Sequence, residues 1–116
     1  MKLPHAGLAE VDPAKSGRYL LSESHPVGKS KARFFREAGF GESTSEVFIR
    51  GLLQIARTQE VLEAFETVHG RKYVLEGELD APSGRRLRVR TIWIVDQGQD
   101  RPRFVTACPA AREGSG

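Results

Sequence analysis

Hydrophobic residues recur with a helical period in the first half of the chain. The positions spaced by three and four residues are Val47, Phe48, Gly51, Leu52 and Ile55. This spacing places them along one side of a helix and predicts an amphipathic helix that packs on a core. Ser43 and Glu46 have the spacing of a capping box, so the helix is expected to begin at Ser43 and to end near Arg57.

Two earlier helices are predicted from their end signals. Asp12 followed by Pro13 is typical of a helix start, because the carboxylate caps free backbone amides and proline fits the first helical position. The segment Ser24–Gly28 interrupts the pattern, and a second helix is expected over Lys29–Ala38. Gly39 then takes the position where a left-handed backbone commonly ends a helix.

After Thr58 the hydrophobic period changes from helical to alternating, which predicts β-strands. The expected strands are Val61–Val68, Arg71–Leu79, Arg86–Asp96 and Arg103–Cys108. His69-Gly70 is interpreted as a two-residue hairpin turn, and the polar loops Asp80–Gly84 and Gln97–Pro102 join the remaining strands. Connections this short favour antiparallel neighbours, so a meander is predicted.

Helices grouped ahead of strands predict the α+β class, with N-terminal helices packed on one face of a four-stranded antiparallel β-meander. We expect residues 1–109 to form one domain. Residues 110–116 are expected to be a flexible C-terminal tail, because they are small, polar and end in glycine and serine. The face of the sheet opposite the helices would be partly open, and function is expected there.

Composition narrows the classes of protein and site. The chain has 116 residues, a net charge of +3 and one cysteine, Cys108, which excludes an intrachain disulfide and favours a reducing compartment. No apolar run approaches the roughly 20 residues of a membrane span, and Met1–Leu8 lacks the apolar core of a secretory signal. A cytoplasmic location is therefore expected, and the alternative is a domain of a longer secreted toxin, which would look the same. Neither metal-ligand spacing nor a glycine-rich phosphate loop occurs, so no metal and no cofactor are expected.

A histidine among cations is the first candidate for chemistry. His25 precedes a predicted helix start that carries Lys29, Lys31 and Arg33. Nearby cations favour a neutral imidazole, which a general base requires, and the free amides of a helix start bind phosphate. The plainer alternative is that His25 and Pro26 end the preceding helix and hydrogen-bond a loop.

Three arginines are the second candidate. Alternation places Arg86, Arg88 and Arg90 on one face of the predicted strand Arg86–Asp96, together with Ile92 and Ile94. The opposite face carries Leu87, Val89, Thr91, Trp93 and Val95. Guanidinium groups bind phosphate through two parallel hydrogen bonds. The alternative is a solvated face whose arginines pair with Glu76 and Glu78 of the preceding strand.

Four stretches of the chain together resemble a known family. They are His25-Pro26-Val27-Gly28 leading into Lys31-Ala32-Arg33-Phe34-Phe35, then Gly70-Arg71-Lys72-Tyr73-Val74, Arg90-Thr91-Ile92-Trp93, and Phe104-Val105-Thr106-Ala107-Cys108-Pro109. They are similar to a bacterial domain-of-unknown-function family, found beside antitoxin-like genes and as C-terminal domains of polymorphic toxins. The similarity extends from about Leu3 to Pro109. Ser30 and Cys108 differ from the pattern, since a basic or imidazole group and a tyrosine would be expected there.

The resemblance implies a fold near the barnase/EndoU/colicin/RelE-like ribonucleases, with helices first and a four-stranded antiparallel sheet after. It also implies that the polar motif positions form the site. The implied site positions are His25, Lys31, Arg33, Lys72, Arg90, Thr91 and Thr106. Threonine also suits strands by β-propensity alone, which is the alternative for both threonines.

The leading hypothesis is a metal-independent ribonuclease-like toxin domain that leaves a 2′,3′-cyclic phosphate. His25, Lys31, Arg90 and Thr106 would be catalytic, and Arg33, Lys72, Arg88 and Thr91 would bind the substrate. RNA and a small acidic antitoxin-like protein are the expected partners. The alternative is a non-catalytic basic interaction module that binds an acidic protein or nucleic acid.

Overall fold

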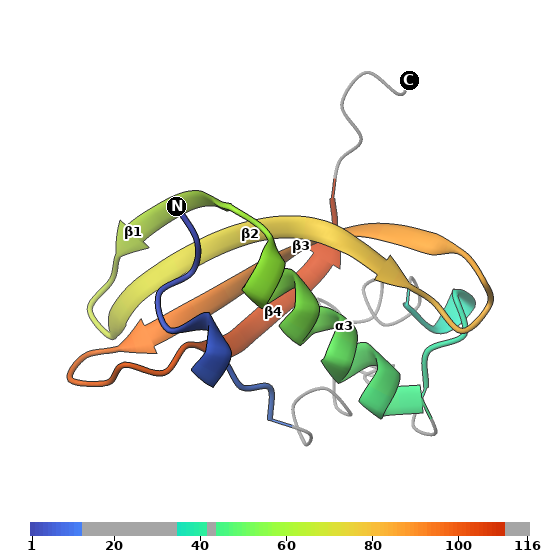
Figure 1. Ribbon diagram of the computed structural model, residues 1–116, viewed down its shortest axis with the longest axis horizontal. Helices are drawn as coiled ribbons and strands as arrows, with labels where there is room; N and C mark the ends of the chain where they lie inside the picture. Colours follow the sequence, from blue (N-terminus) through green and yellow to red (C-terminus); the bar gives the residue numbers. More distant parts are fainter. Residues whose placement is uncertain (13–34, 42–43, 111–116) are drawn as a thin grey trace.

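Four antiparallel strands form one sheet in the order β1-β2-β3-β4, which confirms the predicted meander (Figure 1). The strands are β1 (Val61–Glu66), β2 (Gly70–Asp80), β3 (Arg86–Asp96) and β4 (Arg103–Pro109). The computed structural model describes residues 1–12, 35–41 and 44–110. Within these residues the α+β class is confirmed, with α3 (Ser45–Thr58) directly before β1.

Helix α3 covers one face of the sheet because two glycines allow a close approach. A Cβ atom on Gly51 would lie 2.5 Å from Leu79 Cδ2, and one on Gly77 would lie 2.8 Å from Ile55 Cγ1. The buried side chains of the helix are Phe48, Leu52, Ile55 and Ala56. This agrees with the predicted stripe except at Val47, which is 39% exposed. Thr44 is the N-cap residue, and Ser43 lies outside the described residues.

The end of the predicted helix before α3 is confirmed at Gly39. Residues 35–37 are helical, and Gly39 has a φ of 100°. The amide of Phe40 donates to the carbonyl of Phe35, and the amide of Gly39 donates to that of Arg36, which is the Schellman pattern. The remainder of that helix, and the helix predicted at Pro13, lie outside the described residues.

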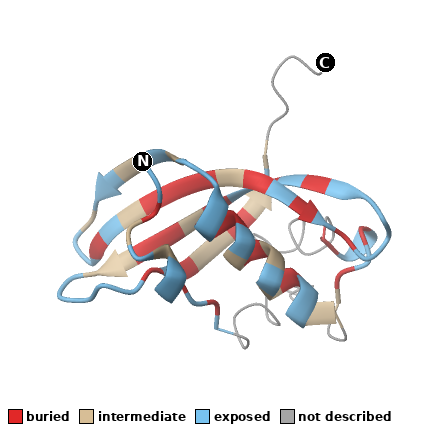
Figure 2. Cartoon of the chain, viewed as in Figure 1, coloured by how far each residue is buried: buried red, intermediate tan, exposed pale blue. Residues whose placement is uncertain are grey.

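The hydrophobic core lies between α3 and the sheet. Burial alternates along β3 from Arg86 to Trp93 (Figure 2), which confirms the two predicted faces over that stretch, whereas Tyr73, Val74 and Leu75 of β2 and Trp93 and Ile94 of β3 are buried in succession. Phe35, Phe40 and Phe48 form an edge-to-face aromatic group, with ring centroids 5.0–6.3 Å apart. Trp93 is completely buried and packs edge-to-face on Phe104 at 5.5 Å. These contacts fix which side of the sheet faces α3.

The first hairpin has a different turn from the one predicted. Thr67 exchanges both backbone hydrogen bonds with Gly70, so the two loop residues are Val68 and His69. Gly70 is therefore the first residue of β2, where its backbone comes so close to Val95 that a Cβ atom would lie 2.2 Å from the carbonyl oxygen. The prediction of a His69-Gly70 turn was wrong, because the glycine serves a close strand approach.

The N-terminal segment pairs with both ends of the strand region, an arrangement that the hydrophobic pattern did not predict. Lys2 forms a bridge with Glu60, and Glu10 forms a parallel bridge with Arg103. Between them, Ala6–Leu8 form a 3₁₀ helix, η1. The side chains of this segment that enter the core are Leu3, Ala9 and Val11. At the other end, the amide of Ala110 donates to the carbonyl of Arg88 at 3.0 Å, and residues 111–116 lie outside the described residues.

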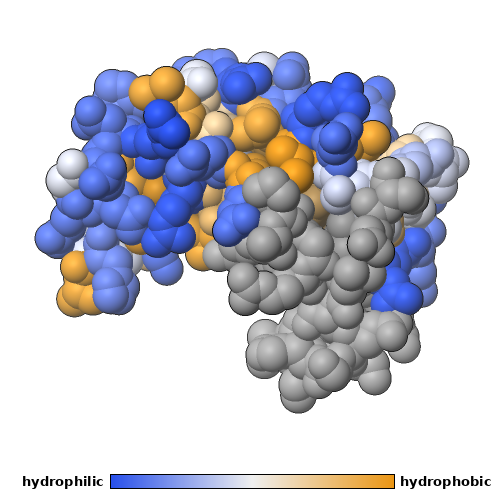
Figure 3. All heavy atoms as spheres, turned by 90° about the horizontal axis from the view of Figure 1, so that it is seen from below, coloured by the Kyte–Doolittle hydropathy of each residue, from blue (hydrophilic) through white to orange (hydrophobic). Residues whose placement is uncertain are grey.

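On the face seen in Figure 3, the coloured surface is mostly hydrophilic, with apolar groups between polar ones. Among the large hydrophobic side chains that are exposed, three lie on or next to the edge strand β1. These are Leu62, Phe65 and Val68, at 59%, 41% and 83% exposure. No helix in the described segments has the length and apolar character needed to cross a membrane.

Candidate site on the open face of the sheet

Five candidate side chains, Lys72, Arg88, Arg90, Thr91 and Thr106, can be placed on one side of the sheet or the other from strand register. Directly paired residues of adjacent strands share a face. Arg90 pairs with Glu76 and Cys108, Ile92 pairs with Val74 and Thr106, and Ile94 pairs with Lys72. We call the side that carries these residues and Arg88 the outer face. It is opposite to α3, which packs on Gly77 and Leu79 of the other side.

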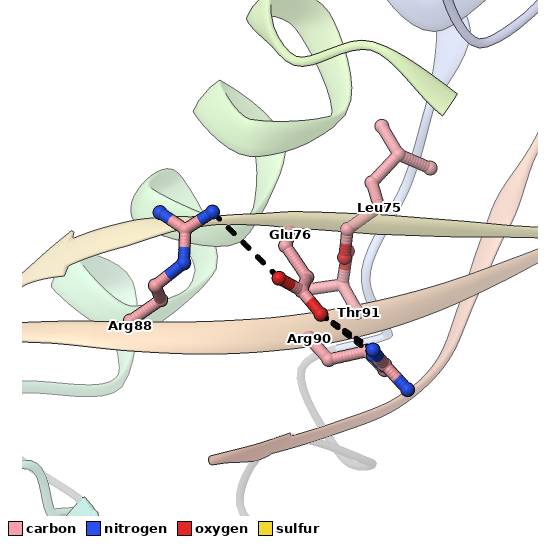
Figure 4. Close-up of polar contacts among 5 residues, drawn as sticks. All are labelled: Leu75, Glu76, Arg88, Arg90 and Thr91. Carbon is pink, nitrogen blue, oxygen red and sulfur yellow. Dashed lines mark hydrogen bonds and ion pairs between the residues drawn. The ribbon is translucent and has the colours of Figure 1, made fainter. Parts of the chain in front are cut away.

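Glu76 holds two arginines at the centre of the outer face (Figure 4). Nε and Nη2 of Arg90 donate to Oε2 of Glu76, at 2.9 and 2.6 Å. Nη2 of Arg88 forms an ion pair with Oε1 of the same carboxylate, at 3.6 Å. The Glu76 hydrogen bonds, then its charge, raise the pKa of Arg90 above its ordinary value, so the guanidinium stays protonated.

The two arginines keep donors for a ligand. A guanidinium has five N–H groups, and those of Arg90 that meet Glu76 come from Nε and Nη2. The Arg90 and Arg88 side chains are 51% and 45% exposed, whereas the Glu76 side chain is 14% exposed. The Glu76 carboxylate is therefore largely buried, whereas the two guanidinium groups that it binds are accessible to solvent. This arrangement suits an anionic group such as phosphate, because the cations are held before it binds.

Ion pairs connect the rest of the β2–β3 hairpin. Arg86 contacts Asp80 at 3.1 Å and Glu78 at 3.9 Å. All three arginines that alternate along β3 are thus paired with acidic residues of β2. The alternative interpretation predicted that these arginines pair with acidic residues across the hairpin, and these ion pairs are confirmed. The pairing does not remove the free donors of the arginines, but it lowers the net charge of the face.

Lys72 and Thr106 lie on the same face as Arg90. Lys72 is half-buried, pairs with Phe65 and Ile94, and makes no ion pair within the described parts of the chain. Thr106 is opposite Ile92, one cross-strand row from Arg90. The structure thus brings together four of the sequence-derived candidates on one surface, namely Lys72, Arg88, Arg90 and Thr106.

Thr91 lies on the opposite side of the sheet, inside the core. It is completely buried, its Oγ1 donates to the carbonyl of Leu75 at 3.2 Å, and it accepts a hydrogen bond from Nε1 of Trp93 at 2.9 Å. A hydroxyl engaged in this way cannot reach a ligand bound to Arg90. We therefore remove Thr91 from the candidate substrate-binding residues, since adjacent strand positions face opposite sides of the sheet.

Thr91→Val should lower the free energy of unfolding by about 1–3 kcal/mol, because the buried indole N–H of Trp93 loses its acceptor. Under the ribonuclease hypothesis, the folded variant should act on RNA at the wild-type rate. Thr106→Val, on the outer face, is the matched control and should lower the cleavage rate. Urea unfolding and an RNA cleavage assay on both variants test this assignment, and reduced cleavage by fully folded Thr91→Val would contradict it.

His25, Lys31 and Arg33 lie outside the described residues, so their positions relative to Arg90 stay predictions. The residue that sequence reasoning undervalued is Glu76. It was considered as a partner of the arginines, although not as the group that holds two of them together. The signal was its register, because alternation and the short β2–β3 loop already placed Glu76 beside Arg90.

A family model matches residues 2–111. The chain belongs to the family described as domain of unknown function (DUF6883). This DUF6883 domain is also similar in structure to one chain of a contact-dependent growth inhibition toxin–immunity protein complex from Klebsiella pneumoniae 342. The TM-score is 0.73 at 18% sequence identity, over 92% of this chain and 97% of the other, which shows a shared fold. Comparison with curated proteins gave no match.

Proposed function

We propose that this domain is a ribonuclease-like toxin that cleaves RNA in the cytoplasm without a metal ion. The observation that carries the proposal is the Glu76-held pair of arginines on the outer face, with accessible donors. The fold shared with a chain of a toxin–immunity protein complex supports the toxin class. The resemblance of the motifs to toxin-associated ribonuclease-like domains supports RNA cleavage as the reaction.

The proposed reaction is an internal transesterification. The ribose 2′-hydroxyl attacks the adjacent phosphorus, the bond to the 5′-oxygen breaks, and the products are a 2′,3′-cyclic phosphate and a 5′-hydroxyl. His25 accepts the proton of the 2′-hydroxyl, and the resulting imidazolium gives that proton to the leaving 5′-oxygen. Arg90 and Lys31 stabilise the charge that develops on the phosphorane, because cations held in place in advance favour the transition state.

The other candidates bind and orient the strand in this proposal. The hydroxyl of Thr106 orients the phosphate from the row next to Arg90. Arg88 and Lys72 contact neighbouring phosphates on the same face, and Arg33 does so from its own segment. Glu76 is a positioning residue, since it touches the guanidinium groups of Arg88 and Arg90.

A small protein partner that inhibits the domain belongs to the same proposal. The structural relative comes from a complex of a toxin with an immunity protein. An acidic surface on the partner would complement Arg88 and Arg90. Loss of toxicity on co-expression with such a protein is the expected behaviour of a toxin of this kind.

The second candidate function is a non-catalytic interaction module. The observation that favours it is the pairing of Arg86, Arg88 and Arg90 with acidic residues of β2. Such pairs are found on ordinary solvated sheet faces. A module of this kind would bind a polyanion or an acidic protein and leave it chemically unchanged.

The purified domain is expected to cleave tRNA and total RNA in EDTA and to leave 2′,3′-cyclic phosphate ends. The measurement is gel electrophoresis of the RNA, followed by end analysis with an enzyme that requires a 3′-hydroxyl, before and after removal of the cyclic phosphate. A matched preparation of His25→Ala controls for contaminating nucleases. RNA that stays intact with the folded wild-type protein rules out the enzyme and leaves the interaction module.

A further inference from the structure

Phe65 is an aromatic side chain exposed on the same face as the arginines. It pairs directly with Lys72 across β1 and β2, so its ring stands on the outer face. Its exposure of 41% is unusual for a phenylalanine in a domain whose other described phenylalanines are buried. A strand position with an exposed aromatic ring beside a cation calls for an explanation other than core packing.

Two apolar residues close to Phe65 on the outer face are buried. Its diagonal neighbour across β2 is Val74, which is 6% exposed, and Ile94 follows Lys72 in the same cross-strand row, at 3% exposure. Both are buried although α3 packs on the other side of the sheet. The ring thus stands at the β1 edge of the outer face, directly beside Lys72 and two same-face rows from the row of Glu76 and Arg90.

The spacing along β2 relates the ring to the proposed phosphate site. Lys72 and Glu76 are the partners of Phe65 and Arg90, and they are four residues apart in one strand. A strand rises about 3.3 Å per residue, so the two rows are about 13 Å apart. A ligand that reaches both must be extended, and it must present an anionic group at one row and a flat apolar surface at the other.

We propose that Phe65 is a base-stacking residue and that the outer face binds single-stranded RNA. This inference rests on the proposed function and names its substrate class. A nucleobase beyond the cleavage point stacks on the Phe65 ring, Lys72 contacts the phosphate beside it, and the scissile phosphate lies at Arg90. Aromatic rings bind bases of single strands in this way because every base has a π face, and bases inside a duplex are already stacked.

Charge on the face agrees with an anionic strand along β2 and β3 rather than along β1. Lys72 forms no ion pair within the described segments, so its ammonium group is available for a phosphate. Glu63 of β1 is on the outer face opposite Val74 and would repel a phosphate at the edge of the sheet. The backbone of the strand should therefore pass over Lys72 and Arg90, with a base directed toward Phe65.

The test measures binding without cleavage. The probe is a fluorescein-labelled oligonucleotide of about eight 2′-O-methyl nucleotides, within the range that single-strand sites cover, and it lacks the attacking hydroxyl. Phe65→Leu should weaken binding about 5- to 100-fold in fluorescence anisotropy, the factor that stacking of one base provides. Phe65→Trp should retain binding. Val68→Ala, at the exposed hairpin turn, is the matched control and should bind like wild type.

Salt dependence and a duplex probe separate stacking from charge. Phe65→Leu should leave the slope of log affinity against log salt concentration unchanged. Lys72→Ala should make that slope shallower by about 0.7, the contribution of one phosphate contact to a single strand. Affinity for an RNA duplex should be the same for Phe65→Leu and wild type. Equal affinity of Phe65→Leu and wild type for the single strand would overturn the inference, and a protein-binding role would then explain the exposed ring.

The outcomes distinguish this inference from the proposed function. Wild-type cleavage in EDTA combined with unchanged binding by Phe65→Leu would end the stacking role and leave the ribonuclease. Binding of the 2′-O-methyl strand that depends on Phe65, without any cleavage of RNA, would keep the stacking role and end the ribonuclease. Absence of both activities in the folded wild type would overturn both.

Discussion

Arg90→Ala should lower the rate of RNA cleavage about 10²–10³-fold, the usual effect of removing one group that stabilises transition-state charge. Arg90 is the best placed cation for this task, because two hydrogen bonds to Glu76 fix its guanidinium before substrate binds. Its side chain is 51% exposed, so the variant should fold. Single-turnover cleavage of a labelled RNA at saturating protein measures the effect on the chemical step.

Two further variants give that measurement its meaning. Arg50→Ala removes the same charge from the exposed side of α3, and it should cleave at the wild-type rate. Arg90→Lys keeps the charge but loses the planar fork, so it should restore only part of the activity. If Arg90→Ala and Arg50→Ala lower the cleavage rate by the same small factor, Arg90 contributes only to general attraction of RNA, and the proposed site is wrong.

Much of the fold could be predicted because its local signals agree with one another. The change from helical to alternating period near Thr58 coincides with the end of α3, and the loops rich in glycine, proline and aspartate occur where the strands end. The glycine expected to end the helix before α3 has the left-handed backbone that this position requires, at Gly39. In each case a pattern within a few residues decides the structure.

The differences occur where distant segments decide. Gly70 was expected in a turn, yet it is needed where β2 comes close to Val95 of β3. Val47 satisfies the helical period, but it lies at the margin of the stripe where α3 has turned away from the sheet. The bridge between Glu10 and Arg103 joins segments that no local signal connects.

The same distinction holds for the candidate site. Alternation sufficed to place Arg88 and Arg90 on one face, and antiparallel register added Glu76 as their common partner. Thr91 was selected by motif resemblance, which does not consider the parity of strand positions. Its neighbour Arg90 faces outward, so Thr91 must face the core. Phe65 carried no motif, and only the register with Lys72 shows that its ring shares the face of the arginines.

Trp93→Ala should lower the free energy of unfolding by about 3–5 kcal/mol, the usual cost of truncating a large buried aromatic side chain. Trp93 is fully buried, packs on Phe104 at 5.5 Å and donates a hydrogen bond to Thr91. A domain of ordinary stability has about 5–15 kcal/mol in total, so this variant should be partly unfolded at growth temperature. Far-UV circular dichroism in urea is the measurement, because the chain has one tryptophan and the variant loses its fluorescence.

Two comparisons show whether that loss comes from the core position of the ring. Trp93→Phe keeps most of the apolar volume, and Thr91 still donates to Leu75. The free energy of unfolding should therefore fall much less in Trp93→Phe than in Trp93→Ala. Val47→Ala, on the exposed margin of α3, should change the free energy of unfolding by less than about 0.5 kcal/mol. A loss below about 1 kcal/mol for Trp93→Ala would mean that the inner face of β3 is not the centre of the core. The separation of core and outer faces would then fail, and with it the exclusion of Thr91 from the proposed site, because both depend on the same alternation along β3.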